Sequence, residues 1–316
     1  MCHHLLNYKI MLKEILTLIK QVAKTGETDL DISEYGLTKL PDALFELSHL
    51  ECLAINDNQL TFLPVEIAKL SRLKNLDLSD NQLLTLPAEI AKLSELETLH
   101  IENNNLAMLS PSIIKLSKLR NLNVSGNQLI VLPAKISQLT KLKELDLSYN
   151  KFIAMPPEIV ELSQLRSLDL SNNPLINIVS NIFLMTRLKT LNISNAKLTT
   201  LPEEFSQLPK LRELDLSTNF LTMVPAAIFD LHKLRELNIN ENNIEVLPSK
   251  ISQLSELEWL DFRDNKLTSL PLTISKLSNL EWLLLENNLL PIPQSILEEA
   301  DDPEKIINYY IKHYSE

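Results

Sequence analysis

Glycine is nearly absent from this sequence. Only Gly26, Gly36 and Gly126 occur among its 316 residues. Doubly wound nucleotide-binding folds need glycines in their phosphate-binding turns, so this scarcity argues against that class. Aromatic residues are also scarce, at 5% of the chain, whereas apolar residues together reach 45%. We therefore expect a large core built mainly from aliphatic side chains.

Cysteine and positive charge are scarce as well. Cys2 and Cys52 are the two cysteines; they lie far apart and do not make a disulfide framework, which favours a reducing compartment. The formal net charge is −11. Nucleic-acid binding depends on phosphate neutralisation by Lys and Arg, so we expect no nucleic-acid partner. An acidic chain also avoids anionic membranes.

Long hydrophobic runs are missing. No stretch of about 18 uncharged apolar residues occurs, so no membrane span is expected. Residues 5–22 are apolar in places, but Lys9, Lys13, Glu14 and Lys20 interrupt them, which is unlike a secretory signal. We expect a soluble, cytoplasmic protein. Export into a host cell by a route outside the Sec pathway stays open as an alternative.

The common catalytic and ligand-binding motifs are absent too. The sequence contains no G-x-x-x-x-G-K-[ST], H-E-x-x-H, G-x-S-x-G or C-x-x-C. Cys2, His3 and His4 are too few and too close together for a structural zinc site. His100 and Glu102 lie two residues apart and are interpreted as a solvated surface pair. We predict no catalytic residue, no cofactor and no metal, and therefore no enzyme.

A strict period organises most of the chain. Eleven leucines recur every 23 residues, and the repeating unit reads L-x-x-L-x-L-x-x-N-x-L-x-x-L-P-x-x-I-x-x-L-x-x. A degenerate earlier copy begins at Glu27, which gives about twelve repeats. The leucines that open the regular copies are Leu50, Leu73, Leu96, Leu119, Leu142, Leu165, Leu188, Leu211, Leu234, Leu257 and Leu280.

This pattern resembles the leucine-rich-repeat superfamily. Its 23-residue form with Leu-Pro is similar to the intracellular repeats of Ras-binding scaffold proteins and plant Ras-group proteins. It is also similar to the repeat modules that precede the GTPase domain of bacterial Roco proteins. The resemblance implies an α/β solenoid, a curved horseshoe with a parallel concave sheet, short helical or extended convex turns and helical caps. It also implies a protein-binding function.

The physical chemistry of one repeat supports the same architecture. Alternation places Leu76 and Leu78 on one face of a short strand, and one repeat cannot bury that face alone. Stacked repeats would pair their strands in parallel. Asn81 could satisfy backbone groups in the turn after the strand, and its equivalents would form a ladder of buried amides. After Leu-Pro, a helical or extended turn such as 88–93 should pack Ile90 inward.

Both ends of the repeat array have the pattern of caps. Apolar residues at roughly helical spacing predict an N-terminal capping helix within residues 1–26. The repeats then occupy residues 27–293. Asp302 followed by Pro303 predicts the start of a capping helix within residues 294–316.

Positions three, five and seven of each repeat should face outward from the sheet. Twelve strands would make a surface roughly 50 Å long, which suffices for a standard protein interface of about 800 Å² per partner. Position five is rich in aspartate. Position two carries a run of cations, and we expect the two columns mainly to pair with each other. These cations are Arg120, Lys143, Arg166, Lys189, Arg212 and Arg235.

Departures from the repeat consensus indicate where a partner binds. Trp259 and Trp282 occupy position three of successive repeats and are the two tryptophans of the chain. Neighbouring exposed tryptophans are typical anchors of a binding hot spot, although the C-terminal cap could instead cover them. Charged and apolar neighbours should complete the patch. The predicted protein-binding residues are Trp259, Trp282, Glu236, Asp261, Arg263, Asp215 and Leu284.

Two further departures lie in the seventh and eighth repeats. Val179 replaces the proline, and Ala196 replaces the ladder asparagine. A local kink, a recognition feature or simple sequence drift would each account for them.

The sequence therefore predicts a cytoplasmic scaffold that binds a protein on its concave surface. The Ras-group resemblance makes a small GTPase or its regulator a candidate partner. The alternatives are the N-terminal repeat module of a larger Roco-type GTPase and a bacterial effector that captures a host protein. A carbohydrate-binding module is less consistent with so few aromatic residues.

Overall fold

The computed structural model describes the backbone of residues 2–314 and the side chains of residues 10–314. It divides into two compact units, Met1–Lys151 and Phe152–Glu316. We call them the first and the second unit. Both are built from the same 23-residue repeat.

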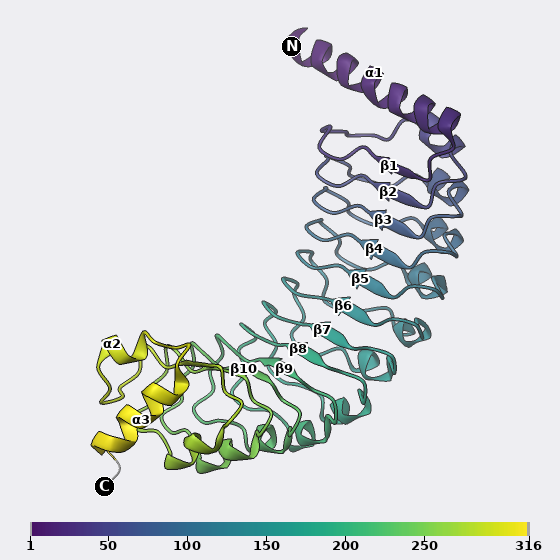
Figure 1. Cartoon of the computed structure of the whole chain (residues 1–316). Helices are drawn as coiled ribbons and strands as arrows, with labels where there is room; N and C mark the ends of the chain where they lie inside the picture. Colours follow the sequence, from purple (N-terminus) through teal and green to yellow (C-terminus); the bar gives the residue numbers. More distant parts are fainter. Residues whose placement is uncertain (1, 315–316) are drawn as a thin grey trace. The chain divides into compact units, whose positions relative to one another are not determined.

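Each repeat contributes one three-residue strand at positions three to five, and successive strands within a unit pair in parallel (Figure 1). The register advances by one whole repeat, so that Leu53 pairs with Leu76 and Leu76 with Leu99. In the first unit the strands are β1 (Asp29–Asp31), β2 (Cys52–Ala54), β3 (Asn75–Asp77), β4 (Thr98–His100), β5 (Asn121–Asn123) and β6 (Glu144–Asp146). In the second unit they are β7 (Ser167–Asp169), β8 (Thr190–Asn192), β9 (Glu213–Asp215), β10 (Glu236–Asn238), β11 (Trp259–Asp261) and β12 (Trp282–Leu284).

A short 3₁₀ helix follows most Leu-Pro pairs on the side of the repeat opposite the strand. The proline carbonyl accepts the first bond, as where Ile90 N–H donates to Pro87 O at 3.1 Å. In the first unit these helices are η1 (Asp42–Glu46), η2 (Val65–Lys69), η3 (Ala88–Lys92), η4 (Pro111–Lys115) and η5 (Ile136–Gln138). In the second unit they are η6 (Pro157–Glu161), η7 (Ser180–Leu184), η8 (Glu203–Gln207), η9 (Ala226–Asp230), η10 (Ser249–Gln253) and η11 (Leu272–Lys276).

The core lies between the strands and the 3₁₀ helices. Leu73, Leu76, Leu78 and Ile90 of one repeat are all buried, and so are most of their equivalents; Leu280, which opens the last regular repeat, is only half-buried. The predicted repeat fold with an aliphatic core is confirmed. Aromatic side chains enter the core at single places, the largest being Phe152, Phe205 and Phe262.

Buried asparagines join consecutive turns, as predicted. The Asn127 Nδ2 group donates to the carbonyls of Ile101, Val124 and Ser125 at 3.0–3.1 Å. Its Oδ1 accepts the N–H of Leu106 at 2.9 Å. Because these backbone groups are largely buried and must be paired, the amide supplies four hydrogen bonds from one side chain.

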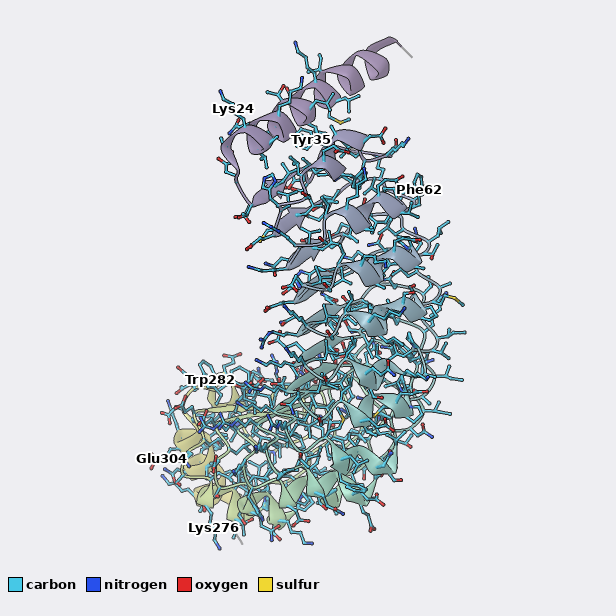
Figure 2. All side chains as sticks on the ribbon, turned by 90° about the vertical axis from the view of Figure 1, so that its right-hand side faces the viewer. Lys24, Tyr35, Phe62, Lys276, Trp282 and Glu304 are labelled. Atoms are coloured by element: carbon cyan, nitrogen blue, oxygen red, sulfur yellow. The ribbon has the colours of Figure 1, made fainter. Side chains whose placement is uncertain are left out.

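Helices occupy the two ends of the array. Helix α1 (Cys2–Thr25) contacts β1 and η1, and it buries Ile15, Ile19 and Val22. Figure 2 shows Tyr35 of the first repeat beside this helix, where a hollow of about 580 Å³ lies between Tyr35 and the Ile10 to Leu18 part of α1. None of the helices within residues 2–314 has the length and apolarity needed to cross a bilayer.

The other end carries α2 (Gln294–Leu297) and α3 (Pro303–Tyr314). Asp302 Oδ1 accepts the Lys305 N–H at 3.0 Å, so the predicted N-cap is confirmed. Helix α3 packs on η11 and α2. The division into caps at 1–26 and 294–316 around repeats at 27–293 stays a prediction.

The two irregular positions behave differently. Val179 takes φ −68° and ψ 138°, close to the values of the prolines it replaces, and η7 begins after it as usual. Inside η7, however, Asn181 leaves the helical region at ψ 16°. At Ala196 the turn itself changes, because both Asn195 and Lys197 have a positive φ. The regular repeats have a positive φ only at the first of these two positions.

Candidate functional site

The outward side of the strands, which we call the strand face, carries three columns of side chains, and they differ in exposure. Position three is the most open. Position seven was expected to be open too, but Ser79 is buried, as are its equivalents Ser148, Ser171 and Ser217. The cause is a local turn, in which Ser79 N–H and Oγ–H donate to Asp77 Oδ1 at 3.0 and 2.6 Å. The acidic column therefore organises the turns that follow the strands.

The expected pairing between the acidic column and the cations of position two is wrong. Two of those cations, Arg120 and Arg235, bind glutamates of their own column one repeat away, and so does Lys74 at the same position of the third repeat. Lys74 Nζ lies 2.6 Å from Glu51 Oε2, and Arg120 Nε lies 3.1 Å from Glu97 Oε2. Arg235 Nη1 lies 3.2 Å from Glu258 Oε1. Side chains of equal position stack directly across a parallel sheet, which favours pairing within a column.

The two tryptophans lie side by side on β11 and β12. Trp259 pairs in register with Trp282, and their ring centroids are 5.4 Å apart with planes tilted by 33°. Trp282 is 40% exposed and Trp259 is half-buried. The C-terminal helices therefore leave the pair accessible; Figure 2 labels Trp282 in this part of the second unit.

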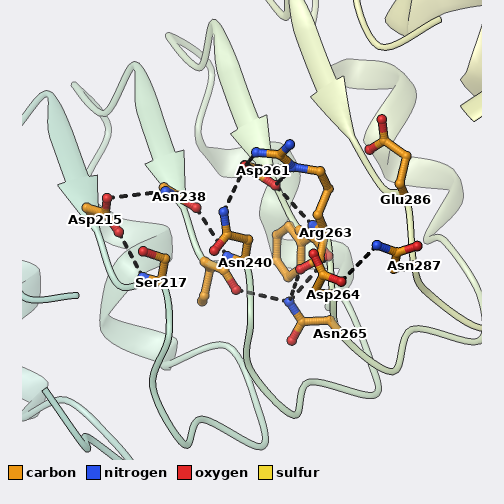
Figure 3. Close-up of polar contacts among 12 residues, drawn as sticks. Asp215, Ser217, Asn238, Asn240, Asp261, Arg263, Asp264, Asn265, Glu286 and Asn287 are labelled. Carbon is orange, nitrogen blue, oxygen red and sulfur yellow. Dashed lines mark hydrogen bonds and ion pairs between the residues drawn. The ribbon is translucent and has the colours of Figure 1, made fainter. Parts of the chain in front are cut away.

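The predicted charged rim needs a correction at Asp261. Its side chain is only 2% exposed, because Arg263 lies over it, with Nη2 2.6 Å from Oδ2 and Nε 3.1 Å from both oxygens. Asn240 Nδ2 also donates to Asp261 Oδ2 at 3.1 Å (Figure 3). Asp261 thus positions Arg263, whose pKa it raises through this hydrogen bond, and only Arg263 is open to a partner.

Two other predicted residues differ in accessibility. Asp215 Oδ1 accepts the Ser217 N–H at 2.8 Å and its Oδ2 accepts Asn238 Nδ2 at 3.2 Å, so this carboxylate is half-buried in a turn (Figure 3). Leu284 is 8% exposed and belongs to the core rather than to the patch. Its neighbour Leu283 donates its N–H to Ala300 O at 2.8 Å, so the segment after α2 covers this edge of β12. The placement of Leu284 in the binding patch was therefore wrong.

A hollow of about 280 Å³ adjoins Trp259 on the strand face. Glu236 stands beside Trp259 in register and belongs to its wall. Partial burial raises the pKa of Glu236, and the nearby Glu213 and Glu258 raise it further. The hollow is lined by Thr190, Asn192, Glu213, Asp215, Glu236 and Trp259, among others.

The first unit carries a second, larger hollow of about 530 Å³ over β1 to β4, which was not predicted. Its floor includes the small residues Cys52 and Ala54, and its walls include Asp31 and Asp77. Cys52 is a free thiol, and burial raises its pKa. Ala54, at a position that elsewhere holds mostly Asp or Asn, is the sequence signal that could have located this hollow.

The predicted surface pair His100 and Glu102 lies at the border of that hollow. Burial is the largest cause of a raised pKa at Glu102, while the nearby His100 acts in the opposite direction. Glu102 Oε2 is buried without a hydrogen-bond partner among the described residues. The interpretation of Glu102 as a solvated side chain is therefore wrong for this oxygen.

Exposed apolar side chains form another unpredicted feature, which both units share. They occupy positions twelve and thirteen of the repeat. These positions lie between the core leucine at position eleven and the Leu-Pro pair at positions fourteen and fifteen. In the first unit the residues are Phe62, Leu84, Met108, Ile130 and Val131, and in the second they are Ile153, Ile176, Met223 and Val246.

No metal site is found within the described side chains, where no group of three or more His, Cys, Asp or Glu residues could hold an ion. The side chains of Cys2, His3 and His4, which were considered at sequence level, lie outside the described residues.

Comparison with protein families gives matches along most of the chain. The family described as a leucine-rich repeat region matches residues 65–171. A second family, described as leucine rich repeat, matches residues 28–83, 163–221, 210–265 and 232–290. No protein of curated function matches the chain.

Several solved structures are similar. A leucine-rich-repeat protein of Leptospira interrogans is 35% identical, with a TM-score of 0.80, and the match covers 84% of this chain and 74% of that one. The ectodomain of the Arabidopsis thaliana receptor kinase GASSHO1/SCHENGEN3, solved with CASPARIAN STRIP INTEGRITY FACTOR 2, is 35% identical with a TM-score of 0.71, covering 81% and 32%. The plant peptide hormone receptor RGFR1, solved with RGF2, is 29% identical with a TM-score of 0.68, covering 82% and 43%. The chain thus spans less than half of either receptor chain.

Proposed function

The chain belongs to the leucine-rich-repeat superfamily, and we propose that it is a non-enzymatic scaffold that holds a protein segment on the strand face of its second unit. The exposed pair of Trp259 and Trp282 carries this proposal. Their ring centroids are 5.4 Å apart, and they are the two tryptophans of the chain.

The physical reason is the cost of leaving indoles in water. Tryptophan offers a large apolar area with few rotatable bonds, so its burial by a partner gives much free energy for little loss of conformational entropy. Glu236 pairs in register with Trp259, and Arg263 follows four residues after Trp259 at position seven of the same repeat, which gives an apolar centre with a polar rim. No catalytic role is proposed for any side chain of this surface.

The similar structures support an extended protein segment as the ligand. Both plant receptors were solved in complex with a second factor, and RGFR1 is a peptide hormone receptor. A peptide or an extended loop of a larger protein would suit a row of short strands.

We propose a narrower partner class on the repeat pattern alone. The 23-residue unit with Leu-Pro resembles Ras-group repeats, so a small GTPase or its regulator in the cytoplasm is the first candidate. Membership of a longer Roco-type protein is the main alternative, and the coding sequence beyond Glu316 distinguishes them. Detection of the protein in a host cell after infection would instead favour an exported effector.

The test is affinity capture from the native lysate with the full chain and, in parallel, with Trp259→Ala. Proteins recovered by the wild type and lost with Trp259→Ala are then purified and titrated directly. The proposal expects at least one such protein. Equal recovery of every bound protein by both chains would place recognition elsewhere, and the cations from Arg120 to Arg235 would be tested next.

A further inference from the structure

Position three of the second unit changes from carboxylates to indoles between β10 and β11. Glu213 on β9 pairs in register with Glu236 on β10. Glu236 in turn pairs with Trp259 on β11, which precedes Trp282 on β12. Two carboxylates therefore continue directly into two indoles. At a strand spacing of about 4.8 Å the four side chains span about 15 Å, the length of four to five residues of an extended segment.

The two carboxylates have no cation of their own. Within residues 10–314 Arg235 pairs with Glu258 and Glu256, and Arg263 pairs with Asp261. None of the ion pairs in that range includes Glu213 or Glu236. Glu213 accepts only a neutral hydroxyl, that of Thr190, at 2.9 Å.

The charged neighbours of Glu236 are repulsive. Besides burial, the groups that raise its pKa are the carboxylates of Glu213 and Glu258, and no cation lowers it. Like charges on neighbouring strands destabilise a sheet. A positive group brought by a partner would therefore find a favourable place that this chain leaves empty.

The hollow of about 280 Å³ lies at this place and has room for one long side chain rather than for a folded element. Glu213 and Glu236 contribute carboxylates to its wall, and Trp259 contributes an indole. A guanidinium can stack on an indole while its N–H groups bind carboxylates in the same plane, whereas an ammonium is a point charge. This combination favours arginine.

We propose that the hollow beside Trp259 binds an arginine side chain of the partner segment, and that the indole pair binds an apolar side chain close to it in sequence. The preferred ligand is thus an extended segment that contains an arginine and, about two residues away, an apolar residue. Side chains on one face of an extended chain recur every two residues. This inference rests on the proposed function, because it names the ligand chemistry of the same surface.

The experiment selects phage-displayed random peptides on the immobilised full chain and then titrates the recovered peptides in solution. Since Trp259 and Trp282 are the two tryptophans of the protein, the intrinsic tryptophan emission reports on this surface alone when the peptides contain none. We expect recovered sequences to be enriched in arginine with an apolar residue nearby. Replacing that arginine by citrulline should weaken binding about tenfold, and replacing it by lysine should weaken it about fivefold.

Substitutions in the protein test the same contact between Glu236 and the arginine of the peptide. Glu236→Gln should weaken the arginine peptides about fivefold to tenfold and reduce the salt dependence of their binding. It should leave the citrulline peptides unchanged. Glu144→Gln is the control, because Glu144 occupies the same position on β6, away from any tryptophan, and binds Asn121.

The outcomes separate this inference from the proposed function. Peptides that change the tryptophan emission but lack arginine enrichment, or that ignore Glu236→Gln, would overturn the inference and leave the binding surface intact. Peptides that bind without changing the emission and tolerate Trp259→Ala would overturn both. Recovery of no peptide above background would also count against both, because an extended segment is the proposed ligand.

Discussion

The two units repeat the same 23-residue pattern, but they differ in their buried asparagines. In the first unit every repeat from the second to the sixth has one. These are Asn58, Asn81, Asn104, Asn127 and Asn150. In the second unit the series is interrupted at Ala196, between Asn173 and Asn219. The interruption shows which hydrogen bonds of the ladder the fold can replace.

Neighbouring groups replace the amide that Ala196 lacks. The N–H of Leu175, which an asparagine at 196 would accept, donates instead to Asn173 O at 2.8 Å. The Ala196 N–H donates to Asn219 Oδ1 at 3.2 Å, beside the regular donor Leu198 at 2.9 Å. The backbone reaches this arrangement by adopting a positive φ of 57° at Lys197.

The first repeat has the same turn, with a glycine at the position that Lys197 occupies in the eighth repeat. Tyr35 stands where the ladder asparagine would be, and Gly36 follows it with φ 63°. Glycine adopts such a φ without steric cost, whereas a lysine does not. The eighth repeat therefore uses the turn of the first repeat with a residue that fits it less well.

The strand faces of the units differ as well. In the first unit Cys52 and Ala54 leave a wide hollow of about 530 Å³ with aspartates at its walls. In the second unit Trp259 narrows the hollow to about 280 Å³ and gives it an aromatic wall. Since both backbones are the same, side-chain size at positions three and five decides what each face can bind.

The largest expected effect concerns Trp259, which distinguishes the strand face of the second unit from that of the first. Trp259→Ala should weaken binding of a captured partner by about 2 kcal/mol or more, because a buried anchor is lost. The stability of the protein should change by less than about 1 kcal/mol, since the ring lies on the surface. Titration and denaturant unfolding measure the two effects, with Asn75→Ala at the equivalent position of β3 as the control. Unfolding of Trp259→Ala would show that the ring supports the fold.

The next prediction concerns the unbroken ladder. Asn127→Ala should destabilise the protein by about 2 kcal/mol, because the buried Leu106 N–H loses its acceptor. The turn cannot relax as at Ala196 without forcing Gln128 to a positive φ. Urea unfolding compares it with Asn56→Ala, a half-buried asparagine whose amide bonds the neighbouring Asp57 carboxylate and which should change stability by less than about 0.5 kcal/mol. An effect of Asn127→Ala as small as that of the control would refute the ladder argument.

A smaller effect of opposite sign is expected at the interrupted position. Lys197→Gly should stabilise the protein by about 0.5–1 kcal/mol, since relief of the left-handed backbone outweighs the entropy that glycine loses on folding. Lys151→Gly is the matched control at the same position of the sixth repeat, where φ is not positive. It should destabilise by about 0.5–1 kcal/mol. The same sign for both variants would contradict the strain at Lys197.

Much of the fold could be predicted from the sequence, because a repeat multiplies every weak signal. Leu76 and Leu78 would say little alone, yet their recurrence every 23 residues locates the strands, the core and the asparagine ladder. The turn at Lys197 could not be predicted, although the Tyr35-Gly36 pair in the first repeat contained the clue.

The binding site was predicted less completely than the fold. Repetition shows which positions face outward, but exposure of a single residue depends on its neighbours. Asp261 satisfies the pattern of an outward residue and is buried by Arg263, only two residues away. Leu284 is buried at the edge of β12 next to the segment that follows α2. The location of a hollow depends on which individual side chain is small, and a consensus pattern does not record such single differences.

The smallest expected effect is also the sharpest test of the comparison. Ala196→Asn should change stability by between zero and about 1 kcal/mol in the stabilising direction. The carbonyls it could reach already accept other bonds, as Leu170 O does from Asn173 and Ile193 O from Asn219.

With an asparagine at 196, however, Lys197 should return to a negative φ, as at the same position of the regular repeats. Lys197→Gly should then become destabilising in the Ala196→Asn background, whereas it stabilises the wild type. A double-mutant cycle measured by urea unfolding should therefore give a coupling energy of about 1–2 kcal/mol. Additive effects within the error of the melts would mean that the backbone at Lys197 is set by something other than the missing amide.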